Sequence, residues 1–322
     1  MPNLELPPPC DRTFELLLSY DCNAKCGFCY NPPLTPEVLA QSVPFALAAQ
    51  LLVQAREQGH DGVWLTGGEP TLRPDLPKIL LLAKKLRFRR IQIGTNGVRL
   101  ANAEHVGRLT RAGLNYARVS LHAASEDIHD ELLELPGSFR KALRAVAHLK
   151  KSGVYVGLNF VVTSRNVGEL PAFFELALGR LGIYDVDVIF LHHRGMMEKN
   201  SDALSLPYAH AVGPLREAWK IVKRHGLRRG MPSLINVPPC ILPELTPWIS
   251  DWSAHEGTDS LALPGKSGGD LIQMKGAQKQ KGPRCATCDV ASRCLGYELS
   301  YARRYGDGEF HPITAIAQKN LR

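Results

Sequence analysis

The sequence has no long apolar segment. Its longest apolar stretches, at residues 42–53 and 76–83, are shorter than the roughly 18 to 20 residues that cross a bilayer. The chain also does not open with the basic, then apolar, then small-residue order of an export signal. These two absences predict a cytoplasmic protein without a membrane partner.

The sequence also lacks a concentrated charge of one sign. Lys and Arg number 39 against 31 Asp and Glu, a formal net charge of +8, and the basic residues are dispersed in short runs such as residues 84–90. We therefore expect no nucleic-acid partner. A moderate positive excess is compatible with an anionic substrate or an acidic redox partner.

Eight cysteines are present in a chain that shows no sign of export. In a secreted protein they would suggest four disulfides, but reduced cysteines that are grouped along the chain are typical of metal ligands. Cys10 stands apart from the other seven and is predicted to be a free thiol. With 322 residues and 44% hydrophobic composition, the chain is long enough for one large domain, or a large and a small one.

The first cysteine group follows an apolar run that begins at residue 13. Cys22, Cys26 and Cys29 have the spacing CxxxCxxC, and no acidic residue or histidine completes a fourth position. Three thiolates can hold three irons of a [4Fe-4S] cluster and leave the fourth iron open to an exchangeable ligand. The alternatives are a zinc knuckle or three buried thiols, although zinc prefers four ligands in a closed tetrahedron.

A glycine turn follows the next apolar strand, at residues 62–66. Its sequence is Gly67-Gly68-Glu69-Pro70, and two glycines at a strand end let the backbone approach a ligand closely. CxxxCxxC with an aromatic residue, Phe28, before the last cysteine, together with this turn, resembles the radical S-adenosylmethionine (SAM) enzymes.

The resemblance implies a cofactor and a reaction. In radical SAM enzymes the open iron binds the amino and carboxylate groups of SAM. An electron from the cluster then cleaves SAM to methionine and a 5′-deoxyadenosyl radical. By this resemblance the SAM-binding residues include Phe28, Gly67, Gly68, Glu69 and Pro70, and the glycine turn with Glu69 binds the SAM amino group.

Strands and helices alternate along residues 13–195. Strands are predicted from residue 13 and at 62–66, 89–94, 117–121, 154–163 and 185–191, and helices at 37–59, 76–86, 104–112, 140–151 and 169–178. This order predicts a parallel sheet with right-handed crossovers, which binds ligands at the carboxyl ends of its strands. We predict an α/β fold, a partial (β/α)6 TIM-like barrel, with both motifs in its mouth.

Further polar residues follow the predicted strands. By resemblance, Ser120 contacts the SAM ribose or carboxylate, and Thr95 or Asn96 lines the same side. The alternative is that these side chains cap turns.

Two histidines and an arginine follow the sixth predicted strand. His192, His193 and Arg194 are predicted to face a substrate beyond the adenosyl group. Because neighbouring strand residues point in opposite directions, at most one of the two histidines is expected to face inward. The alternative is that they are ordinary loop residues.

The remaining cysteines lie near the end of the chain. Cys285, Cys288 and Cys294 are closely spaced, and Cys240 joins them only if a 44-residue loop closes (285 − 240 − 1). On spacing alone, the four predict a zinc or iron–sulfur site. The segment resembles SPASM and shortened Twitch domains, which implies one auxiliary [4Fe-4S] cluster. The related molybdopterin-precursor cyclases have three cysteines here and a Gly-Gly-Arg tail, whereas this chain ends Asn320-Leu321-Arg322.

The sequence therefore predicts four regions: an arm at residues 1–12, the radical SAM core at 13–195, a helical connector at 196–234, and an auxiliary-cluster domain at 235–322. The predicted reaction removes hydrogen from a peptide or protein, followed by oxidation or cross-linking. The alternatives are dehydrogenation or rearrangement of a small metabolite, or a non-catalytic iron–sulfur or zinc scaffold.

Two protein partners are implied. Reductive cleavage of SAM implies a flavodoxin or ferredoxin as electron donor. Because only residues 1–12 precede the first strand, a peptide substrate is expected to need a separate leader-peptide-binding protein.

Overall fold

The computed structural model describes residues 7–227, 231–250, 260–262, 269–270 and 276–314. Part of the predicted arm, residues 1–6, and much of the predicted auxiliary domain, including residues 251–259 and 315–322, lie outside the described residues.

The main element is a parallel sheet in the order β7-β6-β5-β4-β3-β2-β1. Its strands are β1 (Thr13–Leu17), β2 (Gly62–Thr66), β3 (Arg90–Thr95), β4 (Tyr116–Ser120), β5 (Tyr155–Val162), β6 (Val186–Phe190) and β7 (Ser233–Ile235). The six predicted strands are confirmed, and β7 adds a seventh. Beyond β1 the sheet continues through β8 (Ser260–Ala262) and β9 (Gly269–Asp270), and β10 (Lys279–Gln280) pairs with β11 (Tyr297–Glu298) separately.

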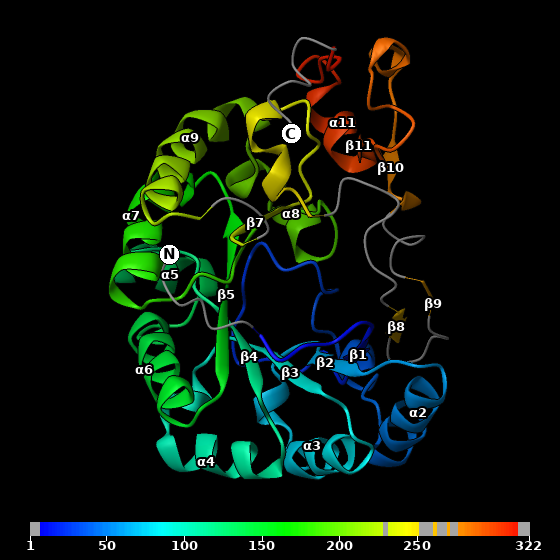
Figure 1. Ribbon diagram of the computed structural model, residues 1–322, viewed down its shortest axis with the longest axis vertical. Coiled ribbons are helices and arrows are strands. Elements are labelled where there is room, and N and C mark those ends of the chain that lie inside the picture. The colour runs from blue at the N-terminus through cyan, green and yellow to red at the C-terminus, as the bar shows by residue number, and fades with distance from the viewer. Residues whose placement is uncertain (1–6, 228–230, 251–259, 263–268, 271–275, 315–322) are drawn as a thin grey trace.

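The crossover helices cover the outer side of this sheet. In Figure 1 they form an arc from α2 to α9, with the strands inside the arc and the C-terminal segment on the opposite, open side. The helices are α1 (Pro36–Leu39), α2 (Phe45–Glu57), α3 (Leu76–Lys85), α4 (Ala103–Ala112), α5 (Glu126–Leu133), α6 (Ser138–Lys151), α7 (Leu170–Phe174), α8 (Met196–Leu204), α9 (Tyr208–Arg224) and α11 (Leu299–Tyr305). The architecture is therefore the predicted partial TIM-like barrel, curled around a mouth.

The two faces of the sheet differ in polarity because strand residues alternate between them. In β4, Ala117 and Val119 belong to the apolar core beneath the helices. Arg118, between them, is buried on the other face and makes 2.8 Å ion pairs with both Asp185 and Asp187. A buried charge needs such partners, so the inner face of the barrel is a polar layer.

Two predicted helices differ from those observed. A single helix over 37–59 is wrong: α1 ends at Leu39, and α2 starts after Pro44, whose fixed φ angle and missing N–H suit a helix start. The helix predicted at 169–178 is α7 followed by a π-helical turn, Glu175–Arg180. The segment predicted as a helical connector contains α8 and α9, and the sequence did not indicate α5.

No helix in the described part of the chain is both long and apolar enough to cross a membrane.

Candidate functional site

The CxxxCxxC loop follows β1 at the carboxyl end of the sheet. Its three cysteines are free and partly buried. The backbone N–H of Ala24 donates to the sulfur of Cys22 at 3.4 Å. Burial raises the pKa of Cys29, and hydrogen bonds from the backbone and side chain of Asn31 oppose that rise.

The three thiols lie near one another in a poorly solvated place. Burial raises the pKa of Cys22 to about 11 and that of Cys26 well above its ordinary value. The charge of each neighbouring cysteine raises the pKa of Cys26 further. Three thiolates here therefore need a cation to balance them, and iron would supply that charge.

The thiols are not arranged around a single point. Within the described ranges, no three His, Cys, Asp or Glu side chains are placed so that they could hold one metal ion. The ligands of a cluster bind separate irons, so their sulfur atoms need not converge on one point. Three thiolates are also one ligand short of the closed tetrahedron that zinc prefers, so the number of donors fits a cluster with one open iron better than a zinc knuckle.

The glycine turn lies directly against the CxxxCxxC loop. The N–H of Gly68 donates to Ser19 O, and the N–H of Glu69 donates to Asp21 O, both at 2.7 Å. Gly67 has a φ of +125°, and a Cβ atom on Gly68 would lie 2.0 Å from Asp21 O. Only glycines allow this approach, so the two sequence motifs form one surface.

Glu69 accepts four hydrogen bonds from the protein. Its Oε1 atom accepts hydrogen bonds from the Thr71 N–H, from the Thr71 hydroxyl at 2.6 Å and from the Thr95 hydroxyl at 2.8 Å. Its Oε2 atom accepts from the Asn96 N–H at 2.7 Å. Burial raises the pKa of Glu69, and these hydrogen bonds oppose the rise. Glu69 therefore joins the ends of β2 and β3, a role that the sequence did not indicate.

Thr95 and Asn96 connect the same strand end to the cysteine loop. Thr95 bonds Glu69, and the Asn96 side-chain amide donates to Asn23 Oδ1 at 2.8 Å. Asn31, which was not singled out from the sequence, donates to Gly67 O at 3.0 Å. Asn23 and Asn31, the two asparagines beside the cysteines, do not belong to a motif of their own. Their position beside the cysteines was the signal that would have found them.

The remaining predicted SAM-binding residues are placed as follows. Pro70 begins a 3-10 turn, Pro70–Leu72, that Glu69 caps. Ser120 is the last residue of β4 and pairs in register with Asn159.

Phe28 is buried and packs edge-on against His122, with ring centroids 4.8 Å apart. His122 was not predicted from the sequence; burial lowers its pKa, and its Nδ1 atom accepts a hydrogen bond from the Val161 N–H at 3.1 Å.

The residues after β6 take three directions. His192 bonds through Nδ1 to Glu298 Oε1 at 3.1 Å, and His193 lies 3.4 Å from Ser201 Oγ. Arg194 stacks on Tyr30, next to Cys29, with its guanidinium 5.6 Å from the ring centre. The two histidines thus contact different parts of the chain, Glu298 and Ser201.

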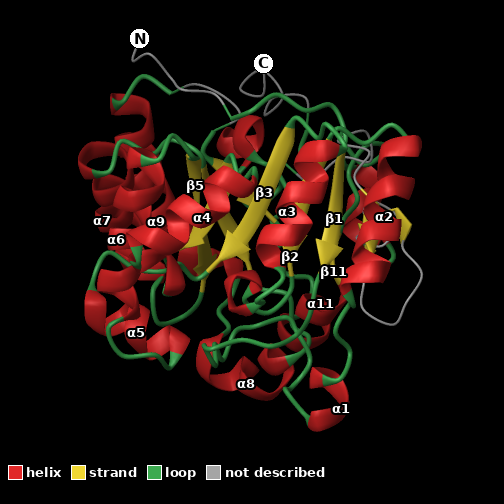
Figure 2. Cartoon of the chain, turned by 90° about the horizontal axis from the view of Figure 1, so that it is seen from below, coloured by secondary structure: helices red, strands yellow, loops and turns green. Residues whose placement is uncertain are grey.

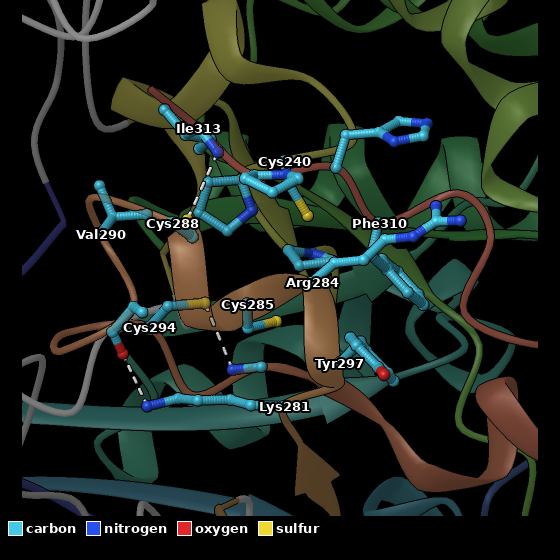
Figure 3. Close-up of a pocket in the computed structure, with 16 residues that line it drawn as sticks. Cys240, Lys281, Arg284, Cys285, Cys288, Val290, Cys294, Tyr297, Phe310 and Ile313 are labelled. Carbon is cyan, nitrogen blue, oxygen red and sulfur yellow. Dashed lines mark hydrogen bonds between the residues drawn. The ribbon is translucent and has the colours of Figure 1, made fainter. Parts of the chain in front are cut away.

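The four C-terminal cysteines line one pocket (Figure 3). Backbone N–H groups donate to two of their sulfurs, from Gly296 to Cys294 at 3.3 Å and from Ile313 to Cys288 at 3.4 Å. Burial raises the pKa of Cys240 to about 12, and the three neighbouring cysteines add to the rise. Lys281 and Arg284 also line the cavity. This donor set fits a fully ligated, negatively charged cluster.

The sequence around this site matches a known protein family. The model of the radical SAM superfamily matches residues 16–177, half of the chain. The chain belongs to the radical SAM superfamily, and the protein is an enzyme of that family. It has the family's [4Fe-4S] cluster and binds SAM. The matched residues include both the CxxxCxxC loop and the glycine turn.

Two curated relatives and one solved structure extend this finding. The chain is 33% identical over 224 residues to PqqA peptide cyclase of Gluconobacter oxydans, covering 70% of this chain and 60% of that protein. It is 34% identical over 188 residues to a probable GTP 3′,8-cyclase of Saccharolobus solfataricus, covering 56% and 58%. The structure of anSMEcpe with bound AdoMet (SAM) and a Kp18Cys peptide has a TM-score of 0.66 at 16% identity, covering 97% and 96%. The chain thus spans about 60% of the curated relatives it matches.

Proposed function

We propose that this radical SAM enzyme oxidises or cross-links a peptide or protein substrate. The observation that carries the proposal is the presence, in one chain, of the CxxxCxxC loop against Gly67–Glu69 and of a second cavity lined by four cysteines. The likeness to PqqA peptide cyclase supports a peptide substrate.

In this proposal each part of the first site has a defined task. Cys22, Cys26 and Cys29 hold a [4Fe-4S] cluster with one open iron. The cluster and SAM supply a 5′-deoxyadenosyl radical, which removes a hydrogen atom from a substrate C–H bond. The carboxylate of Glu69, which receives only one hydrogen bond at Oε2, attracts the SAM ammonium group.

The other residues at this edge shape the SAM pocket. Gly67 and Gly68 bring the backbone close to SAM, Thr95 and Asn96 hold Glu69 in place, and Ser120 contacts the ribose or carboxylate. Phe28 and Pro70 act as apolar walls that exclude water. The supporting observation is the network from Glu69 through Thr95 and Asn96 to Asn23, which rigidifies these groups before SAM arrives.

The second site is proposed to hold an auxiliary [4Fe-4S] cluster through Cys240, Cys285, Cys288 and Cys294. With four ligands no iron is left open, so the cluster would accept an electron rather than bind substrate. This separates the protein from the three-cysteine cyclases, although it is also related to a probable GTP 3′,8-cyclase. The predicted division into a core at 13–195, a connector at 196–234 and an auxiliary domain at 235–322 remains part of this proposal.

His192 is proposed to accept the proton that an oxidation releases. Its Nδ1 atom faces the buried carboxylate of Glu298, and because a carboxylate only accepts, Nδ1 would donate and Nε2 would be the ring's free acceptor. The substrate would lose a hydrogen atom to the adenosyl radical, a proton to His192 and an electron to the auxiliary cluster, so that a new double bond or cross-link forms. His193 and Arg194 are proposed to border the substrate space.

The test begins with anaerobic reconstitution with iron, sulfide and dithionite, followed by SAM. Release of 5′-deoxyadenosine supports the enzyme, and its absence from fully loaded protein would favour the scaffold alternative. Candidate precursor peptides and small metabolites are then compared by mass spectrometry. Loss of two hydrogens from a peptide supports the proposal, whereas turnover of metabolites alone supports the alternative.

The proposal includes two protein partners. A flavodoxin or ferredoxin would replace dithionite as electron donor, and a separate leader-peptide-binding protein would deliver the substrate. Both are tested by adding the purified candidate to the reconstituted enzyme and measuring the rate of 5′-deoxyadenosine release.

A further inference from the structure

Helix α8 contacts the backbone of the CxxxCxxC loop at three points. The N–H groups of Met196 and Met197 donate to Asn31 O at 3.1 Å and to Cys29 O at 3.3 Å. The Asn200 side-chain amide donates to Gly27 O at 3.0 Å. The helix therefore fixes the peptide groups between and after the second and third cysteines.

The fit between α8 and the loop is close. Gly195, just before the helix, has a φ of +66°, and a Cβ atom there would lie 2.3 Å from Asn31 O. A Cβ atom on Gly27 would lie 3.0 Å from Leu204 Cδ1. Met197 is completely buried in the apolar group that includes Phe28. The loop and the helix thus pack tightly against each other.

The other end of α8 is bonded to the C-terminal segment. Asp202 pairs with Arg304 at 2.5 Å, and Ser205, which follows the helix, bonds the Tyr305 hydroxyl at 2.5 Å. Arg304 and Tyr305 belong to α11. Figure 2 shows α8 and α11 on the side of the sheet toward which the strands point.

Helix α11 is in turn continuous with the wall of the four-cysteine cavity. Tyr297, just before it, and Phe310, just after it, both line that cavity. Their rings are stacked, with centroids 3.9 Å apart, and Phe310 also packs on Tyr301 of α11. A chain of direct contacts therefore runs from the cavity through α11 and α8 to the CxxxCxxC loop.

We propose that α8 couples the two cysteine sites. Asn200 is the positioning residue through which the position of α8 affects the conformation of the CxxxCxxC loop. The orientation of the loop's peptide dipoles around the sulfurs helps to set a cluster's potential and its affinity for ligands. Filling the four-cysteine cavity would order its wall and α11, and through α8 it would hold the loop in the conformation that receives SAM. This inference rests on the proposed presence of both clusters.

The first test removes the Asn200 bond. In reconstituted full-length protein, Asn200→Ala and Asn200→Asp should each shift the EPR spectrum and midpoint potential of the SAM-binding cluster. Each should weaken SAM binding about fivefold, as expected for one lost hydrogen bond. Asn200→Gln, which keeps the donor, should restore part of the affinity. The control is Lys199→Ala on the exposed side of the same helix, which should match wild type.

The second test removes a contact between the end of α8 and α11. Tyr305→Phe removes the bond to Ser205 and touches neither cysteine site directly, so it should produce a smaller shift of the same kind. Replacing Cys285 and Cys288 by Ala should also shift the spectrum of the SAM-binding cluster. When combined with Asn200→Ala, the two effects should be less than additive, because they act through one contact chain.

Iron content and Mössbauer spectra separate the possible failures. If wild-type protein holds only one cluster, the proposed auxiliary cluster is wrong. If both clusters assemble but Asn200→Ala and Asn200→Asp leave the spectrum, potential and SAM affinity unchanged, the coupling is overturned. Fully additive effects of Asn200→Ala and the cysteine pair would likewise overturn it.

Discussion

The two cysteine sites of this protein differ in how they are built. Cys22, Cys26 and Cys29 come from one short loop, and Gly67, Gly68 and Asn31 hold that loop against the end of β2. The second site needs Cys240, which is separated from Cys285 by a 44-residue loop (285 − 240 − 1). A local site depends on the conformation of a few residues, whereas the second depends on closure of a long loop.

The charges that act on Cys22 and on Cys294 also differ in sign. At the first, burial raises the pKa of Cys22, and the carboxylates of Glu69 and Asp21 add to the rise. At the second, burial raises the pKa of Cys294 while Lys279 lowers it, and Lys281 and Arg284 line the cavity. An acidic environment favours a cationic ligand such as SAM, and a basic one favours a cluster with four thiolates. The comparison suggests that one site is made for ligand exchange and the other for retaining its cluster.

The largest effect is expected from the first site. Replacing Cys22, Cys26 and Cys29 together by Ala should remove about four irons per chain. It should also abolish 5′-deoxyadenosine formation, because SAM cleavage depends on that cluster. Iron analysis and chromatography of the reaction products measure both. SAM cleavage by this variant would contradict the assignment of the two sites.

Loss of the second site should separate SAM cleavage from product formation. Cys285→Ala with Cys288→Ala should also remove about four irons, while 5′-deoxyadenosine release continues and the oxidised product disappears. The product is followed by mass spectrometry. Full product formation in this variant would refute the electron-accepting role.

A smaller effect is expected where the glycine turn meets the cysteine loop. Gly68→Ala should force the turn away from Asp21 O, since its Cβ atom would lie 2.0 Å from that oxygen. We expect a loss of about 1–3 kcal/mol in the free energy of unfolding, typical of overpacking, and SAM binding reduced more than tenfold. The control is Gly213→Ala in α9, where nothing lies within 4 Å of the added Cβ. Equal stability of the two variants would argue against a tight junction.

The smallest of these effects concerns the charge of Glu69. Glu69→Gln should weaken SAM binding about tenfold with the cluster intact, because a charge-assisted hydrogen bond contributes roughly 1.5–3 kcal/mol. The NH2 group of the new side chain would also face the N–H of Asn96. Two hydrogen-bond donors would then oppose each other, so thermal stability should fall. Calorimetry measures the affinity, and an unchanged value would leave Glu69 with the positioning role alone.

Much of the fold was readable from the sequence because the apolar patterns are local. The alternation of strands and helices predicted six parallel strands, and all six are present. The break between α1 and α2 was missed because the apolar pattern of residues 37–59 continues through Pro44. The seventh strand, Ser233–Ile235, was missed because three residues carry too little periodicity to be recognised.

The chemistry proposed for the first site could be inferred without a structure, since three thiols at fixed spacing in a short loop and a Gly-Gly-Glu turn leave few alternatives. Only the tertiary structure brought Cys240 to the other three cysteines, turned Glu69 toward Thr71, Thr95 and Asn96, and placed Asn200 on Gly27 O. These contacts join residues separated by up to 173 positions, and their formation depends on how the sheet curls and where α8 packs. The spacing of residues along the chain does not predict such long-range contacts, because the free energy that selects them comes from burial and hydrogen bonding of the whole fold.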